Sequence, residues 1–204
     1  MRVISGEARG RKLRAPRSEG ITRPMADKIK EALFSVLASL GVEADRVLDL
    51  FAGSGGVGIE ALSRGAIWCD FVDRDTHAVR AIRENLEHVG FADRARIHQV
   101  PVMTAINAAR EPYDLIIFDP PYADPEILPT LEALSQSMAV QDGTVVAVGH
   151  SPRVEMPEAI GNLVLLRHRC HGDSCFTVFD VTLQNEDEDD VNDESEDHPL
   201  TQAE

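Results

Sequence analysis

Two segments of the chain combine residue types and spacing that suit a reaction. The first is Asp119-Pro120-Pro121-Tyr122, which directly follows the apolar run 113–118. Two successive prolines stiffen a turn and remove its N–H donors, so Asp119 and the Pro120 carbonyl are left as acceptors beside a planar tyrosine. Such acceptors can bind both hydrogens of an exocyclic amino group while the tyrosine stacks on the ring. The motif predicts catalysis at an amino group on an aromatic ring.

The second segment is the glycine-rich stretch LDLFAGSGGVG at 48–58. Gly53, Gly55 and Gly58 fit the pattern G-x-G-x-x-G of a tight strand-to-helix turn, whose backbone N–H groups a ligand can approach. Asp49 precedes these glycines, and its carboxylate would repel a pyrophosphate but attract an amino-acid ammonium. A nucleoside that carries an amino acid and no phosphate is S-adenosylmethionine. We therefore expect S-adenosylmethionine as the cofactor.

Two further acids follow the apolar run 67–72. Asp73 and Asp75 come about 20 residues after the glycines, where an acid can accept hydrogen bonds from ribose hydroxyls. The same features fit an NAD-dependent oxidoreductase, which stays open as an alternative of another class. In isolation, residues 119–122 would indicate only a surface turn. Their place after a strand and their partnership with the glycine loop favour catalysis.

The elements that must position these segments form a βαβ pattern between residues 45 and 180. Short apolar runs alternate with stretches of helical periodicity, which is typical of a mostly parallel sheet. The predicted strands are 46–51, 67–72, 95–100, 113–118, 143–148, 161–169 and 174–183, and the predicted helices between them are 57–64, 76–89, 102–110 and 125–139. The last two strands should pair antiparallel. In such a sheet ligands bind beyond the carboxyl ends of strands, where both motifs fall.

The two ends of the chain differ from this core in charge. Residues 1–30 hold nine Lys or Arg against three acids, a local charge of +6 in a chain whose net charge is −15. We expect residues 2–5 and 11–14 to form a small basic hairpin and residues 25–40 to form an amphipathic helix. The basic side chains predict contacts with phosphates. They are Arg2, Arg9, Arg11, Lys12, Arg14 and Arg23.

Composition predicts a soluble, cytoplasmic monomer with one substantial core. The chain has 204 residues, 43% of them hydrophobic, and no run approaches the roughly 18 to 20 apolar residues of a membrane span. Cys69, Cys170 and Cys175 form no C-x-x-C pair, so we expect reduced thiols and neither a disulfide framework nor a structural zinc site. The histidines at 150, 168 and 171 have no i,i+4 partner and no matched cysteine, so we expect no metal site. Because no apolar run is long enough for a membrane span, we also expect no membrane partner.

Five segments together resemble the RsmD family, the bacterial 16S rRNA (guanine(966)-N(2))-methyltransferases. They are MRVISGEARGRKLRAP, TRPMADKIKEALFSVL, VLDLFAGSGGVGIEALSRGA, FVDRD with the following Asn85, and FDPPY. The resemblance implies an α/β fold, that of the Rossmann-like class I S-adenosylmethionine-dependent methyltransferases, with a mostly parallel seven-stranded sheet. It also implies methyl transfer from S-adenosylmethionine to guanine N2 of 16S rRNA in the assembling small ribosomal subunit.

The resemblance also implies roles for matching residues. The cofactor-binding set is Asp49, Phe51, Gly53, Gly55, Asp73 and Asp75, and the set that holds the target base is Asp119, Pro120, Pro121 and Tyr122. Thr22, Arg23 and Pro24 match a motif beside the cleft. The chain departs from the family after the third strand, where residues 101–103 offer adenine no polar side chain, and after the fifth, where Gly149 and His150 stand for a Glu-His pair.

The chain then divides into a basic N-terminal hairpin and helix (1–40), a methyltransferase domain (41–184) and an acidic tail (185–204). The tail holds ten acids and almost no large apolar residue, so we expect it to be disordered.

The nearest alternative function is that of a DNA or other RNA exocyclic-amino methyltransferase, because the same motif suits similar amines. A non-catalytic RNA-binding assembly factor is an alternative of a third class.

Overall fold

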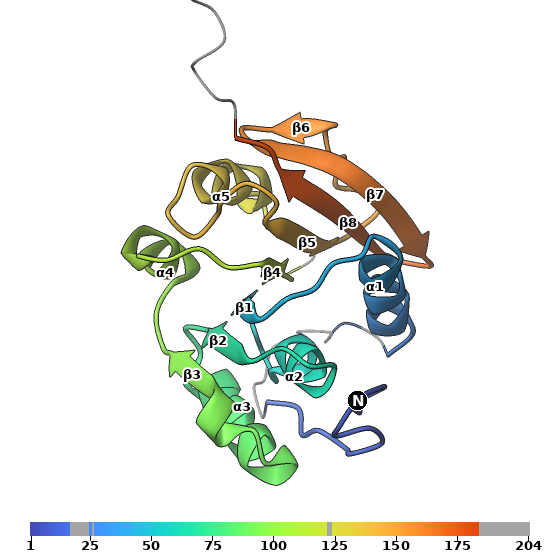
Figure 1. The fold of residues 1–204 in the computed structure, drawn as a ribbon, viewed down its shortest axis with the longest axis vertical. Helices are drawn as coiled ribbons and strands as arrows, with labels where there is room; N and C mark the ends of the chain where they lie inside the picture. Colours follow the sequence, from blue (N-terminus) through green and yellow to red (C-terminus); the bar gives the residue numbers. More distant parts are fainter. Residues whose placement is uncertain (17–24, 26, 122–123, 184–204) are drawn as a thin grey trace, which may run out of the picture.

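The computed structural model describes residues 1–16, 25, 27–121 and 124–183. These residues form one sheet with helices on both faces (Figure 1). Its strands are β1 Arg46–Leu50, β2 Trp68–Val72, β3 Ala95–His98, β4 Leu115–Phe118, β5 Val145–His150, β6 Ala159–Ile160, β7 Leu163–His171 and β8 Ser174–Val181. The helices are α1 Asp27–Ser39, α2 Gly56–Ser63, α3 Thr76–Val89, α4 Val102–Ala108 and α5 Ile127–Ser135, with the short 3-10 helix η1 Ala92–Arg94.

The strand order is β3-β2-β1-β4-β5-β8-β7-β6. The strands β1 to β5 pair in parallel, and the last three strands pair antiparallel. The chain runs from β1 outward to β3 and then returns to the other side of β1 at β4, so the strand order reverses between β1 and β4. The predicted doubly wound α/β sheet and the antiparallel pair at its end are confirmed.

The sheet in the described part of the chain has eight strands where seven were predicted. The additional strand is β6, which pairs with the start of β7. A strand of two residues is too short to show a period of two along the sequence, so only tertiary pairing identifies it.

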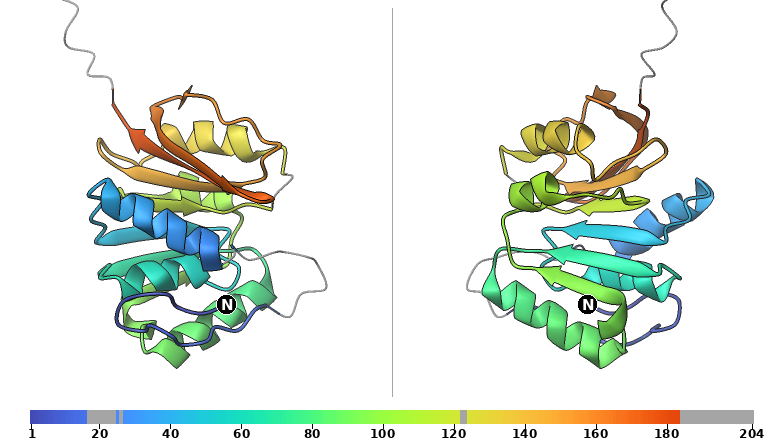
Figure 2. Two further views of the ribbon diagram at one scale, coloured as in Figure 1. Left: turned by 90° about the vertical axis from the view of Figure 1, so that its right-hand side faces the viewer. Right: turned by 60° about the vertical axis from the view of Figure 1, so that its left-hand side comes forward.

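Two apolar clusters pack on the sheet, one on each face. Helices α1, α2 and α3 cover one face, and α4 and α5 cover the other (Figure 2). All four residues of β4 are buried, as expected for a central parallel strand. Strand β8 contributes Phe176 and Val178 to the first cluster and Phe179 and Val181 to the second, because successive side chains of a strand point to opposite faces.

The N-terminal segment, residues 1–16, is less regular than the predicted basic hairpin. Within it, a single antiparallel bridge pairs Arg2 with Lys12. Val3, Ala8 and Leu13 are buried in the first apolar cluster. Several of the segment's N–H groups bond to side chains of α2 rather than to a partner strand, which explains why the predicted ladder is so short.

The expectation of three reduced cysteines is wrong for two of them. Cys170 and Cys175 form a disulfide, and Cys69 is a free buried thiol. The turn between β7 and β8 sets a register in which Cys170 lies directly opposite Cys175. Spacing rules for cysteines do not reveal such a pair, because the contact depends on the hairpin register.

Helix α5 is shorter than the predicted range 125–139. It ends at Ser135, whose hydroxyl donates to the carbonyl of Glu132 at 2.7 Å, and the Ser137 hydroxyl donates to the carbonyl of Leu134 at 2.8 Å. Such local bonds compete with helical backbone bonds. Among the described residues, no helix is both long enough and apolar enough to cross a membrane.

Candidate active site

The candidate active site forms where β1, β2 and β4 end, beside the point at which the strand order reverses. Backbone bonds tie these ends together: the N–H of Asp119 donates to the carbonyl of Leu50 at 3.4 Å, and the N–H of Ala52 donates to that of Val72 at 3.1 Å. The fold thus brings the two predicted motifs to neighbouring strand ends, as expected for a ligand site of a doubly wound sheet.

The glycine loop between β1 and α2 is a sharp turn built from left-handed residues. Gly53 has a φ of 57° and Gly55 a φ of 74°. Phe51, with a φ of 59°, is the one non-glycine residue of the described chain with positive φ. Its ring meets that of Phe118 edge-on, with 5.3 Å between the centroids. A bulky residue in this conformation costs about 1 to 3 kcal/mol, and such strain gathers at ligand sites.

Asp49 is buried under the glycine loop and holds the start of α2. Its Oδ2 accepts from the N–H of Gly58 at 2.9 Å. A Cβ at 58 would collide with Phe71 and would lie 2.8 Å from Cys69 Sγ, so only glycine fits. Burial raises the pKa of Asp49 to about 8, against the lowering effect of the Gly58 N–H.

Asp73 and Asp75 organise the loop that follows β2. The Asp73 carboxylate accepts from the N–H of Gly53 and from the N–H of Asp75, both at 2.9 Å. The Asp75 side chain caps α3 by accepting from the N–H of His77 at 2.8 Å. Each Asp73 oxygen keeps a second lone pair for a ligand hydroxyl, whereas Asp75 already has a structural role.

Asp119 follows β4 and is half-buried, and burial raises its pKa to about 7. Gly149, at the end of β5, leaves room for its carboxylate: a Cβ at 149 would collide with Asp119 Oδ1 and lie 3.3 Å from Met25 Cε. Pro120 is buried and Pro121 is exposed. Sequence analysis missed the role of Gly149, because a glycine near the end of a strand carries no local signal for the side chain packed against it.

Tyr122 lies outside the described residues, as do Thr22, Arg23 and Pro24. Their predicted roles stay predictions.

The carboxylates at the site repel one another. After burial, the charges on Asp119 and Asp73 are what raise the pKa of Asp49. A cation bound among these groups relieves that repulsion, and an anion increases it. The electrostatics therefore favour a positively charged ligand over a pyrophosphate.

His150 follows Gly149 but points to the opposite face of β5. The ring is buried, its Nδ1 donates to the carbonyl of Ser151 at 2.9 Å, and its Nε2 lies 2.9 Å from Thr177 Oγ1. Burial lowers the pKa of His150. These contacts fit the structural role expected for this histidine.

A pocket of about 360 Å³ opens around the start of α5. It lies between the residues that follow β4 and those that follow β5, and sequence analysis did not anticipate it. Its lining includes Asp124, Ile127, Ser151 and Arg153. Arg153 contributes a cation to the lining of this space.

The predicted basic side chains of the N-terminal segment are exposed. The Arg14 guanidinium pairs with Glu84 on α3 at 3.1 Å, and Arg11 donates to the carbonyl of His88 at 2.7 Å. Among the described residues, no acid pairs with Arg9 or Lys12. These two side chains are therefore the cations of the segment most available to a polyanion.

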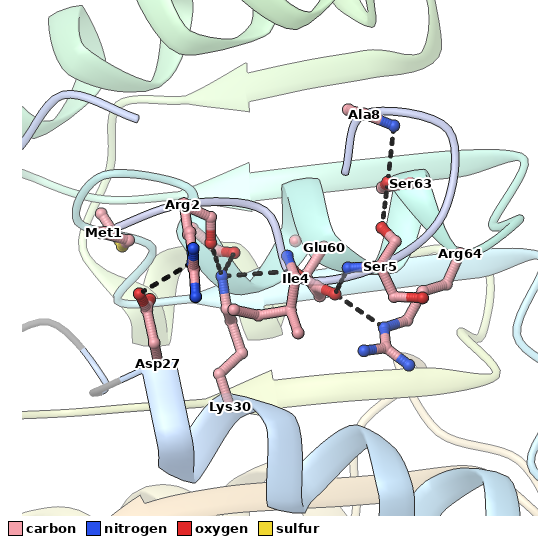
Figure 3. Close-up of polar contacts among 12 residues, drawn as sticks. Met1, Arg2, Ile4, Ser5, Ala8, Asp27, Lys30, Glu60, Ser63 and Arg64 are labelled. Carbon is pink, nitrogen blue, oxygen red and sulfur yellow. Dashed lines mark hydrogen bonds and ion pairs between the residues drawn. The ribbon is translucent and has the colours of Figure 1, made fainter. Parts of the chain in front are cut away.

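A buried ion pair anchors the N-terminal segment to α1 and α2 (Figure 3). Lys30 Nζ lies 3.3 Å from Glu60 Oε2 and donates to the carbonyl of Arg2 at 2.7 Å. The Glu60 carboxylate also accepts from the N–H groups of Ile4 and Ser5, at 2.7 and 3.0 Å. Burial lowers the pKa of Lys30, although Glu60 opposes that effect.

Asn85 joins the same segment to the glycine loop. Its side-chain amide donates to the carbonyls of Arg14 and Ser54, both at 2.9 Å, and its oxygen accepts from the N–H of Arg14 at 2.8 Å. The side chain is buried. Asn85 therefore fixes the basic segment relative to the loop that follows β1, a role the motif alone did not reveal.

Comparison with known proteins gives the family. The family described as "Conserved hypothetical protein 95" matches residues 1–180. "Ribosomal RNA small subunit methyltransferase D" of Escherichia coli (strain K12) is 31% identical over 186 residues, which cover 91% of this chain and 92% of that protein. The chain belongs to the RsmD family.

Two further relatives support the assignment to the RsmD family. A Bacillus subtilis (strain 168) protein named "Putative rRNA methyltransferase YlbH" is 41% identical over 176 residues, which cover 84% of this chain and 94% of that protein. A solved Escherichia coli structure, "Putative methyltransferase yhhF", has a TM-score of 0.78 at 30% identity and covers 90% of this chain and 99% of its own. The predicted family and its class I methyltransferase fold are confirmed.

Proposed function

We propose that the chain transfers a methyl group from S-adenosylmethionine to the exocyclic N2 of a guanine in 16S rRNA, within the assembling small ribosomal subunit. The observation that carries this proposal is the Asp119 carboxylate, held at the end of β4 next to the glycine loop of β1. The relatives named as rRNA methyltransferases support the substrate class. The proposal includes a monomer acting in the cytoplasm.

The residues present fit S-adenosylmethionine. A Cβ at Gly53 would meet only the Phe51 carbonyl, at 3.8 Å, so the loop leaves open space above its backbone. The carboxyl of Asp49 lies under the loop, where a bound ammonium group would favour its ionised form. Asp73 has lone pairs left for ribose hydroxyls. When bound, the cofactor supplies an electrophilic methyl group on a sulfonium.

The chain's own contribution is positioning and charge. The amino group of guanine is a weak nucleophile because its lone pair is delocalised into the ring. Asp119 and the Pro120 carbonyl would accept the two amino hydrogens, so that the nitrogen can pyramidalise toward the methyl group. The Asp119 carboxylate would also offset the positive charge that develops on nitrogen. The pocket at the start of α5, which Arg153 lines, offers room for a base and its phosphate.

The basic N-terminal segment would hold the RNA. We propose Arg2, Arg9, Arg11, Lys12, Arg14 and Arg23 as phosphate contacts, with residues 1–40 serving RNA binding and 41–184 serving methyl transfer. Side chains that neutralise phosphates displace counterions and make binding dependent on salt. Because Asn85 ties this segment to the glycine loop, bound RNA would lie at a fixed place relative to the cofactor.

The test is methyl transfer from labelled S-adenosylmethionine to small subunits purified from a strain that lacks this enzyme. Mass spectrometry of digested 16S rRNA should then show one N2-methylguanine per subunit. Asp119→Ala should bind S-adenosylhomocysteine normally but lower the single-turnover rate at least about a hundredfold. Methylation of adenine, of DNA alone or of no nucleic acid would contradict the proposal.

A further inference from the structure

A second group of reactive side chains lies on the β7–β8 hairpin, outside the candidate active site. Cys170 faces Cys175 across the hairpin, and His168 precedes Cys170 by two residues on the same face, opposite Thr177. One ring nitrogen of His168 and the two sulfurs all lie within 4.8 Å of one another. His168 and Cys170 are exposed, and Cys175 is buried.

Hydrogen bonds fix which nitrogen of His168 carries the lone pair. A carbonyl only accepts, so His150 Nδ1 carries the hydrogen that bonds to Ser151. In the neutral ring Nε2 of His150 then accepts from the Thr177 hydroxyl, whose oxygen is left to accept from Nδ1 of His168 at 2.9 Å. The lone pair of neutral His168 is therefore on Nε2, which lies 3.2 Å from Cys170 Sγ.

We propose that the reduced hairpin binds a thiophilic divalent cation, Zn²⁺, through Nε2 of His168 and the sulfurs of Cys170 and Cys175. The disulfide is the oxidised, metal-free form of this site. A two-electron reductant such as a dithiol or a trialkylphosphine breaks the S–S bond, so that each sulfur gains one electron and one proton while the dithiol becomes a disulfide or the phosphine a phosphine oxide. Binding of Zn²⁺ then releases the two thiol protons, because the ligands are thiolates. The site is independent of the proposed methyl transfer.

The geometry and the donor types select this class of ion. Zn–S bonds of about 2.3 Å and Zn–N bonds of about 2.0 Å at tetrahedral angles place the donor atoms roughly 3.5 to 3.8 Å apart. The donor atoms here already lie within 4.8 Å of one another. Two sulfurs and one imidazole favour Zn²⁺ over Mg²⁺ or Ca²⁺, which prefer oxygen. Thr177 acts as the outer partner that orients the histidine ligand.

The spacing rules applied to the sequence did not find this site. His168, Cys170 and Cys175 form a pattern H-x-C-x4-C that differs from the usual paired ligands of structural zinc sites. The register of β7 against β8 brings the three residues together. The outer partner comes from the same register, because Thr177 faces His168.

The test uses the full chain, reduced with a water-soluble trialkylphosphine, which takes up oxygen from water as its phosphine oxide. After removal of the reductant under argon, titration with Co²⁺ should give thiolate-to-cobalt charge-transfer absorption that saturates at one ion per chain. Zn²⁺ should displace the Co²⁺ and abolish the absorption. The oxidised protein should bind no Co²⁺ with this signal.

Three variants separate this site from nonspecific binding. Cys170→Ser should abolish the charge-transfer signal of the bidentate thiolate site, and His168→Ala should weaken binding at least tenfold. Thr177→Val should weaken it about 10- to 100-fold, as loss of an outer-shell partner does. The matched control is His171→Ala, the exposed neighbour on the same hairpin, which should bind like the parent. Far-ultraviolet circular dichroism checks that each variant is folded. A reduced parent without charge-transfer absorption, or equal affinity in His168→Ala, would overturn the proposal.

Discussion

Methyl transfer by this protein should depend on pH through Asp119. Burial raises the pKa of this carboxyl to about 7, whereas an exposed aspartate titrates near 3.9. Only the ionised form can both accept a hydrogen bond from the amino group and offset the positive charge that develops on the nitrogen. With a pKa of about 7, the ionised fraction is about a tenth at pH 6 and about nine tenths at pH 8. We therefore expect kcat/KM to rise roughly tenfold between pH 6 and pH 8.

The assay is kcat/KM for methylation of small subunits at subsaturating substrate, since this parameter reports groups of the free enzyme. Asp119→Asn should lose this dependence, because its amide has no proton to lose, while it retains more activity than Asp119→Ala. Asp49, whose pKa is raised to about 8, titrates nearby. The comparison with Asp119→Asn assigns the step near pH 7 to the correct carboxyl.

Protonation of Asp119 at pH 6 should lower activity without destabilising the fold. Between the ordinary aspartate pKa and about 7, the folded protein binds more protons at Asp119 than the unfolded chain does. Stability therefore falls as pH rises through this window, and acidification from pH 8 to pH 6 stabilises the fold through this group. The activity and the contribution of Asp119 to stability should therefore move in opposite directions, and the difference in melting temperature between the parent and Asp119→Asn at each pH isolates that contribution. A pH-independent kcat/KM in the parent, or the same profile in Asp119→Asn, would refute the assignment.

Three further predictions concern the glycine at the end of β5, the cofactor and the RNA. Gly149→Ala should lower methyl transfer with little loss of cofactor affinity, because the added methyl group takes the space of the Asp119 carboxylate; single-turnover rates and isothermal titration with S-adenosylhomocysteine separate the two effects. Asp73→Ala should weaken S-adenosylhomocysteine binding by about 1 to 3 kcal/mol in the same titration, since acceptors for ribose and for the glycine loop are lost; unchanged affinity would move the ribose contact elsewhere. Neutralising Arg9 and Lys12 together should flatten the salt dependence of RNA binding more than Arg14→Gln does, because Arg14 is already paired, and filter binding at several salt concentrations checks this; equal slopes would place the phosphates on another surface.

Local sequence patterns predict most of the sheet and the strand ends that carry the site. The runs that become β1, β2 and β4 are largely apolar, as expected for strands buried on both faces, and glycines mark the turn into α2. Features that depend on register or on long-range contact left no local pattern. They include β6, the disulfide, and the space that Gly149 leaves for Asp119.

The placement of the basic segment shows why polar anchors escape sequence analysis. Hydrophobic periodicity reveals apolar packing. Glu60 and Asn85, however, hold this segment through hydrogen bonds to its backbone N–H and C=O groups. Nearly every residue type supplies such groups, so the sequence of the segment does not reveal the bonds. A buried ion pair such as Lys30 with Glu60 adds little net stability, because desolvation offsets the attraction, but removing one partner costs about 3 to 5 kcal/mol. The contacts of this ion pair depend on orientation, whereas apolar contacts do not, so the pair fixes how the segment lies on α2. The exposed basic segment is thereby held against α2, the helix that follows the glycine loop. If the proposed roles hold, the RNA and the cofactor bind to one rigid frame.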